Sequence, residues 1–409
     1  MSERRLSFGC SPALFGIILL LLMLGAGGFL GNQYMRPLPA VAASPQLAAE
    51  KTIGTPPELP WPNKGSSAVW IDSFGFLGAR GEDTARPIAS TAKIMTALLV
   101  LENKPLNIGQ PGPEVTITAA DVADYQRDIS QDQSVVPVRV GEKLTELELL
   151  QGLLLPSGNN IADLLAKWEA GSEAAFIAKM NAKAAELGMK KTHYDDASGF
   201  SAKTVSTPSD LLILSAKAMA NPVFRQTVAM VQTTLPYAGV VKNVNTILGK
   251  DGNIGIKTGT TDEAGGCFVS ASVQQVAGKP MEVYSAVLGQ DHRDDALDAT
   301  RALSKAVGSS LSQMKVLSRS DVVAVLTPAW GAPVEVVSSQ DIEMLVWPGT
   351  TLKTSVQLDA VKAPFAAGSK AGTVTLTLGQ STQQVDLVTT GAIVEPDWQW
   401  RSTRFLRQQ

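Results

Sequence analysis

The chain has 409 residues, of which 44% are hydrophobic and 18% charged, and its formal net charge is −3. This length allows two or three domains, one of them large enough for a substantial core. A charge this close to zero gives no basic surface for nucleic acid, and the two cysteines cannot form a disulfide framework.

Residues 13–31 form an uncharged apolar run that follows Arg4 and Arg5. Its first eighteen residues, 13–30, would rise about 27 Å as a helix, close to the thickness of a bilayer core. The two arginines favour a cytoplasmic N-terminus at residues 1–12, so we expect 13–31 to be a single-pass signal-anchor in the cell membrane, with the remainder extracytoplasmic. Cys10 and Cys267 would then lie on opposite sides of the membrane, unable to pair.

A small-residue sequence, Ala40-Val-Ala42, could act as a signal-peptide cleavage site. Signal peptides are usually cleaved close behind a shorter apolar region. The distance of this site from the apolar run therefore favours an uncleaved anchor, and cleavage would instead give a secreted protein.

Residues 32–62 carry seven prolines among alanines and serines, a composition that predicts a semi-extended linker. In the following segment, 63–311, predicted strands lie at both ends and helices between them. The strands are expected at 67–72, 252–257, 267–274 and 281–288, and helices at 90–101, within 144–222 and at 294–307. This order predicts an α+β domain with a sheet packed by helices.

From residue 319 to 400 the pattern changes to short β-branched or alternating runs separated by glycine and proline. These runs predict a small all-β sandwich domain. The tail Trp398-Gln-Trp-Arg401 is expected to pack on this domain rather than on lipid headgroups.

Three short motifs carry the candidate chemistry: Ser90-Thr-Ala-Lys93, Ser157-Gly-Asn159 and Lys257-Thr-Gly259. Ser-x-x-Lys alone is weak, because it should occur about once by chance in a chain of this length. Ser312-Gln-Met-Lys315 is such a second copy; a helix surface is its default interpretation, and it lies outside the order of the three motifs. The order and the intervals of 67 and 167 residues after Ser90 are what indicate one shared cleft.

The first motif places an activated serine beside its base. Ser90 and Lys93 are three residues apart on a predicted helix and therefore share a face. Lys93 must be neutral to accept the serine proton, and burial and the charge of Lys257 would both lower its pKa.

The other two motifs suit proton transfer and peptide binding. Ser157 is expected to relay a proton between the lysines and a leaving amine, although a turn serine is the alternative. Asn159 has both amide groups for a peptide backbone, and Gly259 lets a substrate lie against the strand edge. Arg293 is a candidate partner for a terminal carboxylate, with an exposed loop arginine as the equal alternative.

The two histidines, His193 and His292, have no metal-ligand spacing and give no Ser-His-Asp triad. We expect both to be surface residues. No metal and no cofactor is predicted.

The motif surroundings resemble the serine D-Ala-D-Ala carboxypeptidases, the low-molecular-mass penicillin-binding proteins. Residues Arg86–Leu99 look like their nucleophile segment, and Leu153–Asn160 and Gly255–Thr261 look like their second and third motifs. The resemblance spans roughly residues 60–311, and it implies a β-lactamase/transpeptidase-like fold with an antiparallel sheet. It also implies an oxyanion hole made by the backbone N–H groups of Ser90 and Thr260, and Thr258 and Thr260 are expected to bind the substrate carboxylate.

The resemblance further implies the reaction. The protein would remove the terminal D-Ala from peptidoglycan stem pentapeptides through an acyl-enzyme on Ser90, acting in bacterial cell-wall biogenesis. β-Lactams would acylate the same serine because they mimic D-Ala-D-Ala.

Three alternatives remain open at this point. A DD-endopeptidase uses the same chemistry on cross-links, but such relatives usually lack a C-terminal β domain. A class A β-lactamase needs a Glu-x-x-x-Asn segment, which is absent between Asn159 and Lys257. A catalytically silent wall-binding protein would keep the fold without the reaction.

Overall fold

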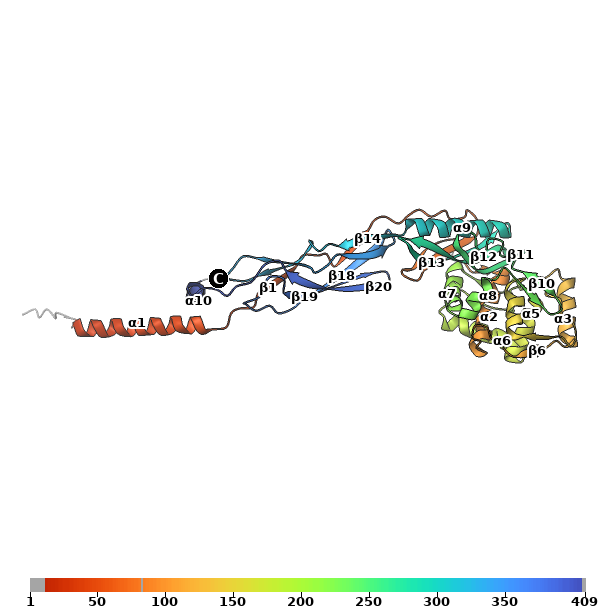
Figure 1. Ribbon diagram of the computed structural model, residues 1–409, viewed down its shortest axis with the longest axis horizontal. Helices are drawn as coiled ribbons and strands as arrows, with labels where there is room; N and C mark the ends of the chain where they lie inside the picture. The colour runs from red at the N-terminus through yellow and green to blue at the C-terminus, as the bar shows by residue number, and fades with distance from the viewer. Residues whose placement is uncertain (1–11, 82–83, 407–409) are drawn as a thin grey trace, which may run out of the picture.

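A computed structural model describes residues 12–81 and 84–406. The cytoplasmic N-terminus predicted at residues 1–12 lies almost wholly outside this range, as does Cys10. The molecule is elongated, with an N-terminal helix at one end, a β domain in the middle and a mixed α/β domain at the other end (Figure 1).

The mixed domain is built on a five-stranded antiparallel sheet with the order β11-β12-β13-β3-β4. Its strands are β3 (Ser66–Ile71), β4 (Gly75–Arg80), β11 (Asn253–Thr261), β12 (Gly265–Val276) and β13 (Lys279–Gln290). The sequence predicts four of these strands, because their β-branched and apolar residues favour a half-buried pleated surface. The edge position of β11 leaves one side of its backbone unpaired within the sheet.

Alternate residues of the sheet pack on its two faces. Val69 and Val287 point toward α9 (Arg293–Ser310), whereas Ala68 and Ala286 point into the larger helical core. The helices of that core are α2 (Lys93–Asn103), α3 (Ala119–Ser130), α4 (Glu146–Leu154), α5 (Asn159–Ala170), α6 (Glu173–Glu186), α7 (Pro208–Met219) and α8 (Pro222–Val228). Every residue of α2 from 93 to 101 is buried, so this helix runs through the middle of the domain.

Three two-stranded ribbons complete the mixed domain. They are β5 (Arg86–Pro87) with β8 (Val205–Ser206), β6 (Glu114–Thr116) with β7 (Lys143–Thr145), and β9 (Gln232–Leu235) with β10 (Gly239–Lys242). The predicted α+β class with an antiparallel sheet packed by helices is confirmed.

The β domain consists of a seven-stranded antiparallel sheet, in the order β1-β15-β16-β20-β19-β18-β2, and a two-stranded ribbon of β14 and β17. Its C-terminal strands are β14 (Ser312–Leu317), β15 (Val322–Thr327), β16 (Val334–Ser338), β17 (Ile342–Val346), β18 (Thr350–Leu358), β19 (Lys370–Leu378) and β20 (Ser381–Thr389). The second Ser-x-x-Lys copy lies in β14, so its default interpretation as a helix surface is wrong. The alternation of exposed and buried residues expected of a strand is weak there, since four of its six residues are exposed.

The predicted linker needs a correction. Within residues 32–62, β1 (Ala42–Pro45) pairs with β15, and β2 (Glu50–Ile53) pairs with β18. Pro45 is tolerated in β1 because this strand lies at a sheet edge, where one row of backbone groups needs no partner, and β2 falls between the prolines. Composition therefore misled the prediction, and the two edge strands of the β domain precede the mixed domain in sequence.

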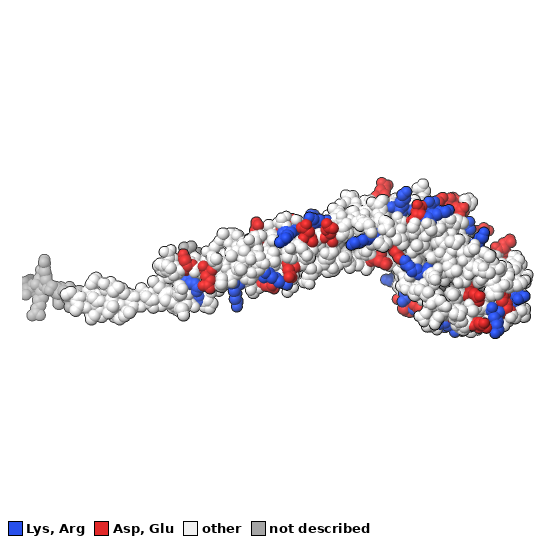
Figure 2. Space-filling view, viewed as in Figure 1, with Lys and Arg blue, Asp and Glu red and all other residues white. Residues whose placement is uncertain are grey.

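The N-terminal helix α1 (Pro12–Met35) is the one helix within residues 12–81 and 84–406 that is long and apolar enough to cross a membrane. It carries no charged side chain, and among the residues that the structure describes, Figure 2 shows the first charges where the β domain starts. The chain ends in α10 (Trp398–Thr403) and the 3-10 helix η3 (Arg404–Leu406). The tail is predicted to pack on the β domain, and Trp400 does so, edge-to-face against Trp330 with ring centroids 5.6 Å apart, whereas Trp398 is exposed.

Candidate active site

Ser90 lies in a short 3-10 helix, η1 (Ala89–Ala92), that leads directly into α2. The preceding residue, Ala89, has a φ of 46°, a left-handed conformation that is unfavourable for a residue with a Cβ. Such conformations are kept where the surrounding fold determines them, and they cluster at functional sites. The turn brings the Ser90 hydroxyl to 2.8 Å from the Nζ of Lys93.

The Lys93 amine is fully buried and has three polar neighbours. Besides the Ser90 hydroxyl, these are the Oδ1 of Asn159 at 2.6 Å and the backbone carbonyl of Ser198 at 3.0 Å. Two of the three can only accept, whereas the hydroxyl can also donate. A neutral amine satisfies all three by donating twice and accepting the Ser90 proton.

Burial lowers the pKa of Lys93 to about 7, although the charges of Asp196, Asp163 and Asp128 partly oppose this shift. The desolvation of the charged amine is the larger effect because no carboxylate contacts it directly. Near neutral pH this lysine can therefore act as a base.

Ser157 and Lys257 form the second hydroxyl–amine pair. Lys257 donates to the Ser157 hydroxyl at 3.0 Å and to the backbone carbonyl of Thr258 at 3.1 Å. Ser157 lies between α4 and α5 and has a φ of 69°, so both serines of the site lie in strained turns. Burial, and then the nearby charge of Lys93, lowers the pKa of Lys257 well below its usual value.

Ser90 and Asn159 border a cavity of about 460 Å³, whereas Lys93, Ser157 and Lys257 are buried behind its lining. It is lined by Ser90, Asn159 and Thr260 together with Gln131, Asp132, Gln133, Ser134, Phe200, Thr261, Asp262 and Glu263. Because Thr260 belongs to the edge strand β11, a peptide could add alongside that strand within the cavity.

Gly259 sets the distance between this strand and the nucleophile. A Cβ on residue 259 would lie 2.8 Å from the backbone nitrogen of Ser90 and 3.1 Å from the carbonyl of Ile88. Only a glycine lets the two backbones approach this closely. The backbone segments that carry the predicted oxyanion-hole donors are therefore adjacent.

Some predicted residues do not border the cavity. Arg293 begins α9, and its guanidinium lies 3.4 Å from Asp294. Thr258 is buried and does not line the cavity. His193 and His292 are exposed, as predicted.

The sequence interpretation missed the loop at residues 131–134 and Phe200. Gln133 accepts a hydrogen bond from the amide of Asn159 and so helps to orient it. The loop is a polar stretch with no motif or periodicity, and its position opposite β11 arises only from packing. Phe200 follows Gly199, whose φ of 81° and close contact with the carbonyl of Ala89 fix this turn beside the nucleophile.

A family profile described as D-alanyl-D-alanine carboxypeptidase, peptidase S11, matches residues 64–292, more than half of the chain. The chain belongs to this family. All three motifs lie inside the matched range.

Individual relatives agree with this assignment. The chain is 37% identical over 221 residues to a D-alanyl-D-alanine carboxypeptidase, DacB2, of Mycobacterium tuberculosis, covering 51% of this chain and 72% of that protein. It is 30% identical over 247 residues to a D-alanyl-D-alanine endopeptidase of Escherichia coli, covering 57% and 75%.

Solved structures show the same fold. A DD-transpeptidase of Streptomyces K15 matches with a TM-score of 0.55 and 30% identity, over 62% of this chain and 99% of that one. Penicillin-binding protein 5 from Haemophilus influenzae matches with a TM-score of 0.59 over 83% of this chain and 99% of that one. The latter likeness, at 20% identity, concerns the fold alone.

Proposed function

We propose that this protein is a membrane-anchored serine D-Ala-D-Ala carboxypeptidase that removes the terminal D-Ala from peptidoglycan stem peptides. The observation that carries the proposal is the buried Lys93 amine bonded to the Ser90 hydroxyl, since Ser90 itself lines the cavity of about 460 Å³. Family membership supports the substrate class.

In the first half-reaction, neutral Lys93 takes the Ser90 proton while the serine oxygen attacks the carbonyl carbon of the penultimate D-Ala. The resulting oxyanion accepts hydrogen bonds from the backbone N–H groups of Ser90 and Thr260. The Ser157 hydroxyl donates its proton to the leaving nitrogen and regains one through the adjacent lysines. The C–N bond breaks, and D-Ala departs.

In the second half-reaction, water attacks the acyl-enzyme ester. Lys93 accepts a proton from the water, and the Ser90 oxygen is reprotonated as the shortened peptide leaves. β-Lactams enter the same path, and their acyl-enzyme persists because the opened ring stays attached to Ser90.

The helix α1 fits the role of an anchor with the catalytic domain on the extracytoplasmic side. Its 24 residues rise about 36 Å, enough to cross a bilayer core of about 30 Å. The catalytic domain then lies at the far end of the molecule from the membrane (Figure 1).

The test is intact-mass analysis of the full-length protein in detergent after incubation with a penicillin, followed by peptide mapping. We expect a long-lived adduct on Ser90 that is absent in Ser90→Ala, and release of D-Ala from a pentapeptide. Rapid release of hydrolysed penicillin would indicate a β-lactamase, and no adduct would refute the mechanism.

A second candidate activity is cleavage of cross-links, which is supported by relatives named D-alanyl-D-alanine endopeptidase. A pentapeptide and a cross-linked dimer assayed at equal concentration separate the two. Faster cleavage of the cross-linked dimer would mean that the protein is an endopeptidase rather than a carboxypeptidase.

A further inference from the structure

The C-terminal segment of the described chain meets the C-terminal end of α1. The ring of Phe405 packs edge-to-face on Phe29 of α1, with centroids 5.0 Å apart. Arg404 donates through Nη1 to the backbone carbonyl of Pro37 at 3.0 Å. The C-terminal helix therefore lies beside the last turns of the anchor helix (Figure 1).

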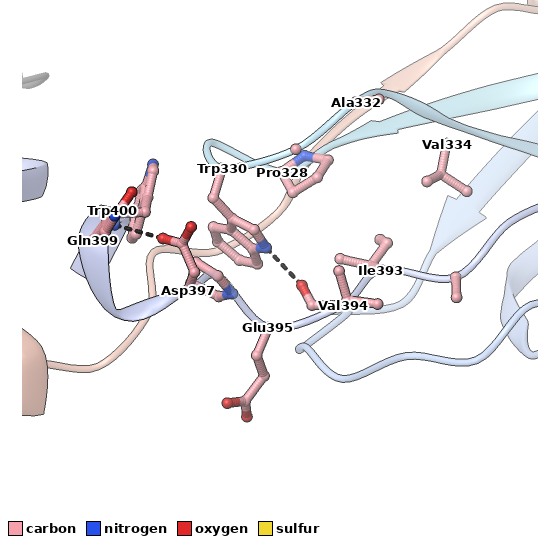
Figure 3. A pocket seen from close by; sticks show the side chains of 13 residues that line it. Pro328, Trp330, Ala332, Val334, Ile393, Val394, Glu395, Asp397, Gln399 and Trp400 are labelled. Atoms are coloured by element: carbon pink, nitrogen blue, oxygen red, sulfur yellow. Dashed lines mark hydrogen bonds between the residues drawn. The ribbon is translucent and has the colours of Figure 1, made fainter.

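The position of α10 is fixed by the β domain behind it. Figure 3 shows Trp330 donating to the carbonyl of Val394, at 2.8 Å, while Asp397 caps α10 by accepting from the backbone N–H of Trp400 at 2.7 Å. These contacts hold the arginines that α10 and η3 carry in a defined place.

Three guanidinium groups gather at this junction: those of Arg36, Arg401 and Arg404. Arg401 lies over the ring of Tyr34 at 5.3 Å and pairs with Glu395 at 2.9 Å. Arg404 is only 7% exposed, and its Nη2 has no hydrogen-bond partner within the described part of the chain. Burial, and then the charges of Arg36 and Arg401, lowers the pKa of Arg404.

A buried guanidinium nitrogen without a partner is costly, and the cost falls if an anion binds it. The arrangement has more positive than negative charge, because Glu395 is the one carboxylate seen paired with these arginines in residues 12–81 and 84–406. An arginine fork binds a phosphate group through paired N–H donors.

The position of these arginines at the end of α1 favours a lipid headgroup over free phosphate as the source of the phosphate group. The apolar run of α1 ends near Leu30, so Arg36 follows it by less than two helical turns. Apolar side chains remain exposed beside the arginines, Leu406 at 71% and Trp398 at 67%. Tryptophan and arginine at the end of a spanning helix are typical of the headgroup layer.

We propose that Arg36, Arg401 and Arg404 form a binding site for the phosphate group of an anionic phospholipid in the leaflet from which the β domain emerges. This inference rests on the anchoring role of α1 proposed above. The site would fix the tilt and height of the β domain over the membrane, in addition to the tether supplied by α1.

The experiment uses the full chain reconstituted into vesicles of phosphatidylcholine that contain either brominated phosphatidylglycerol or brominated phosphatidylcholine, over the same series of mole fractions. Tryptophan fluorescence reports contact with the brominated lipid. We expect quenching by the phosphatidylglycerol to be half-complete at about a fivefold lower fraction, the preference that one arginine near a membrane surface supplies. Added inorganic phosphate, at matched ionic strength, should not remove this preference.

Arg404→Gln should abolish the preference and leave D-Ala release from a soluble pentapeptide unchanged, because Arg404 is remote from the catalytic cavity. Arg36→Gln should weaken the preference for phosphatidylglycerol. Because the Arg36 side chain is exposed, this variant keeps the test valid if Arg404→Gln unfolds. Arg319→Gln, on an exposed turn of the β domain, is the matched control and should retain the preference.

Equal quenching by the two lipids would overturn the proposal. Loss of the preference in phosphate buffer would show that the site binds free phosphate, and would overturn the proposal that its ligand is a lipid headgroup. Failure of the protein to float with either vesicle would refute the anchor itself, an outcome that vesicle flotation measures separately from lipid preference.

Discussion

At the level of single residues, the burial of Lys93 determines which protonation state the site favours. An ammonium could donate to all three of its polar neighbours, but it would leave Ser90 without a base. A neutral amine can accept from the Ser90 hydroxyl while it donates to Asn159 and Ser198. Burial lowers the pKa of Lys93 to about 7 and so favours this neutral form.

This arrangement predicts the pH dependence of acylation. With a pKa of about 7 in place of 10.5, Lys93 is mostly neutral at pH 8, whereas an ordinary lysine would be less than about 1% neutral. The second-order rate of acylation by a penicillin should therefore rise through about pH 7 and level off above it. Lys93→Arg, which stays charged, should reduce the rate by about a thousandfold at every pH. A profile that rises only near pH 10 would contradict the assignment of Lys93 as base.

Gly259 gives a second prediction at this scale. In Gly259→Ala the new Cβ would push β11 away from the backbone nitrogen of Ser90, so acylation should slow by about a hundredfold, as for loss of one oxyanion donor. Gly152→Ala is the matched control, because its Cβ would meet only ordinary contacts of 3.5 Å or more. Equal acylation rates in the two variants would show that the close approach at residue 259 is not needed.

At the level of elements, sequence reasoning succeeded where a local pattern reports a local structure. The segments that form β3, β12 and β13 are apolar and β-branched, so their pattern predicts strands. The three motifs contain the serines and lysines whose side chains take part in the proposed reaction. It failed for β1 and β2, because an edge strand tolerates the prolines that composition assigns to a linker. The loop at 131–134 carries no pattern, and its place opposite β11 depends on how whole elements pack.

Helix α4 offers a stability prediction at this scale. Its first residue, Glu146, is fully buried, and neither carboxylate oxygen has a partner among the described residues. Burial raises its pKa from 4.5 to about 7, with Lys104 opposing the shift. A raised folded-state pKa means that the favourable contribution is present below about pH 4.5 and is lost as the pH rises through 7.

Glu146→Gln removes the charge and keeps the shape. The apparent melting temperature should therefore rise by about 3 °C at pH 8, corresponding to about 1 kcal/mol, and should change little at pH 4.5. Glu114→Gln, on an exposed carboxylate of the same domain, is the control and should have little effect at either pH. A gain for Glu146→Gln that is the same at both pH values would show that titration is not its cause.

At the level of the whole molecule, chain order and spatial order differ. The two edge strands of the β domain, β1 and β2, come before the catalytic domain, and the five strands between them come after it. The catalytic domain is therefore inserted into the β domain. Trp347 of the β domain and Leu59 of the preceding segment also pack in the cluster beneath α9, which joins the two domains.

This topology predicts the outcome of trimming the N-terminus. A fragment of residues 37–409 keeps both edge strands, whereas 57–409 loses β1 and β2 but retains Leu59. The shorter fragment loses eight registered cross-strand pairs, about 2–4 kcal/mol, and exposes the edges of β15 and β18. Its β domain should melt at a lower temperature and self-associate through the bare edges, while D-Ala release per molecule stays the same. Calorimetry and size-exclusion chromatography of the two fragments measure this. Identical melting curves and a monomeric short fragment would mean that β1 and β2 contribute little, and that residues 32–62 act as the linker their composition suggests.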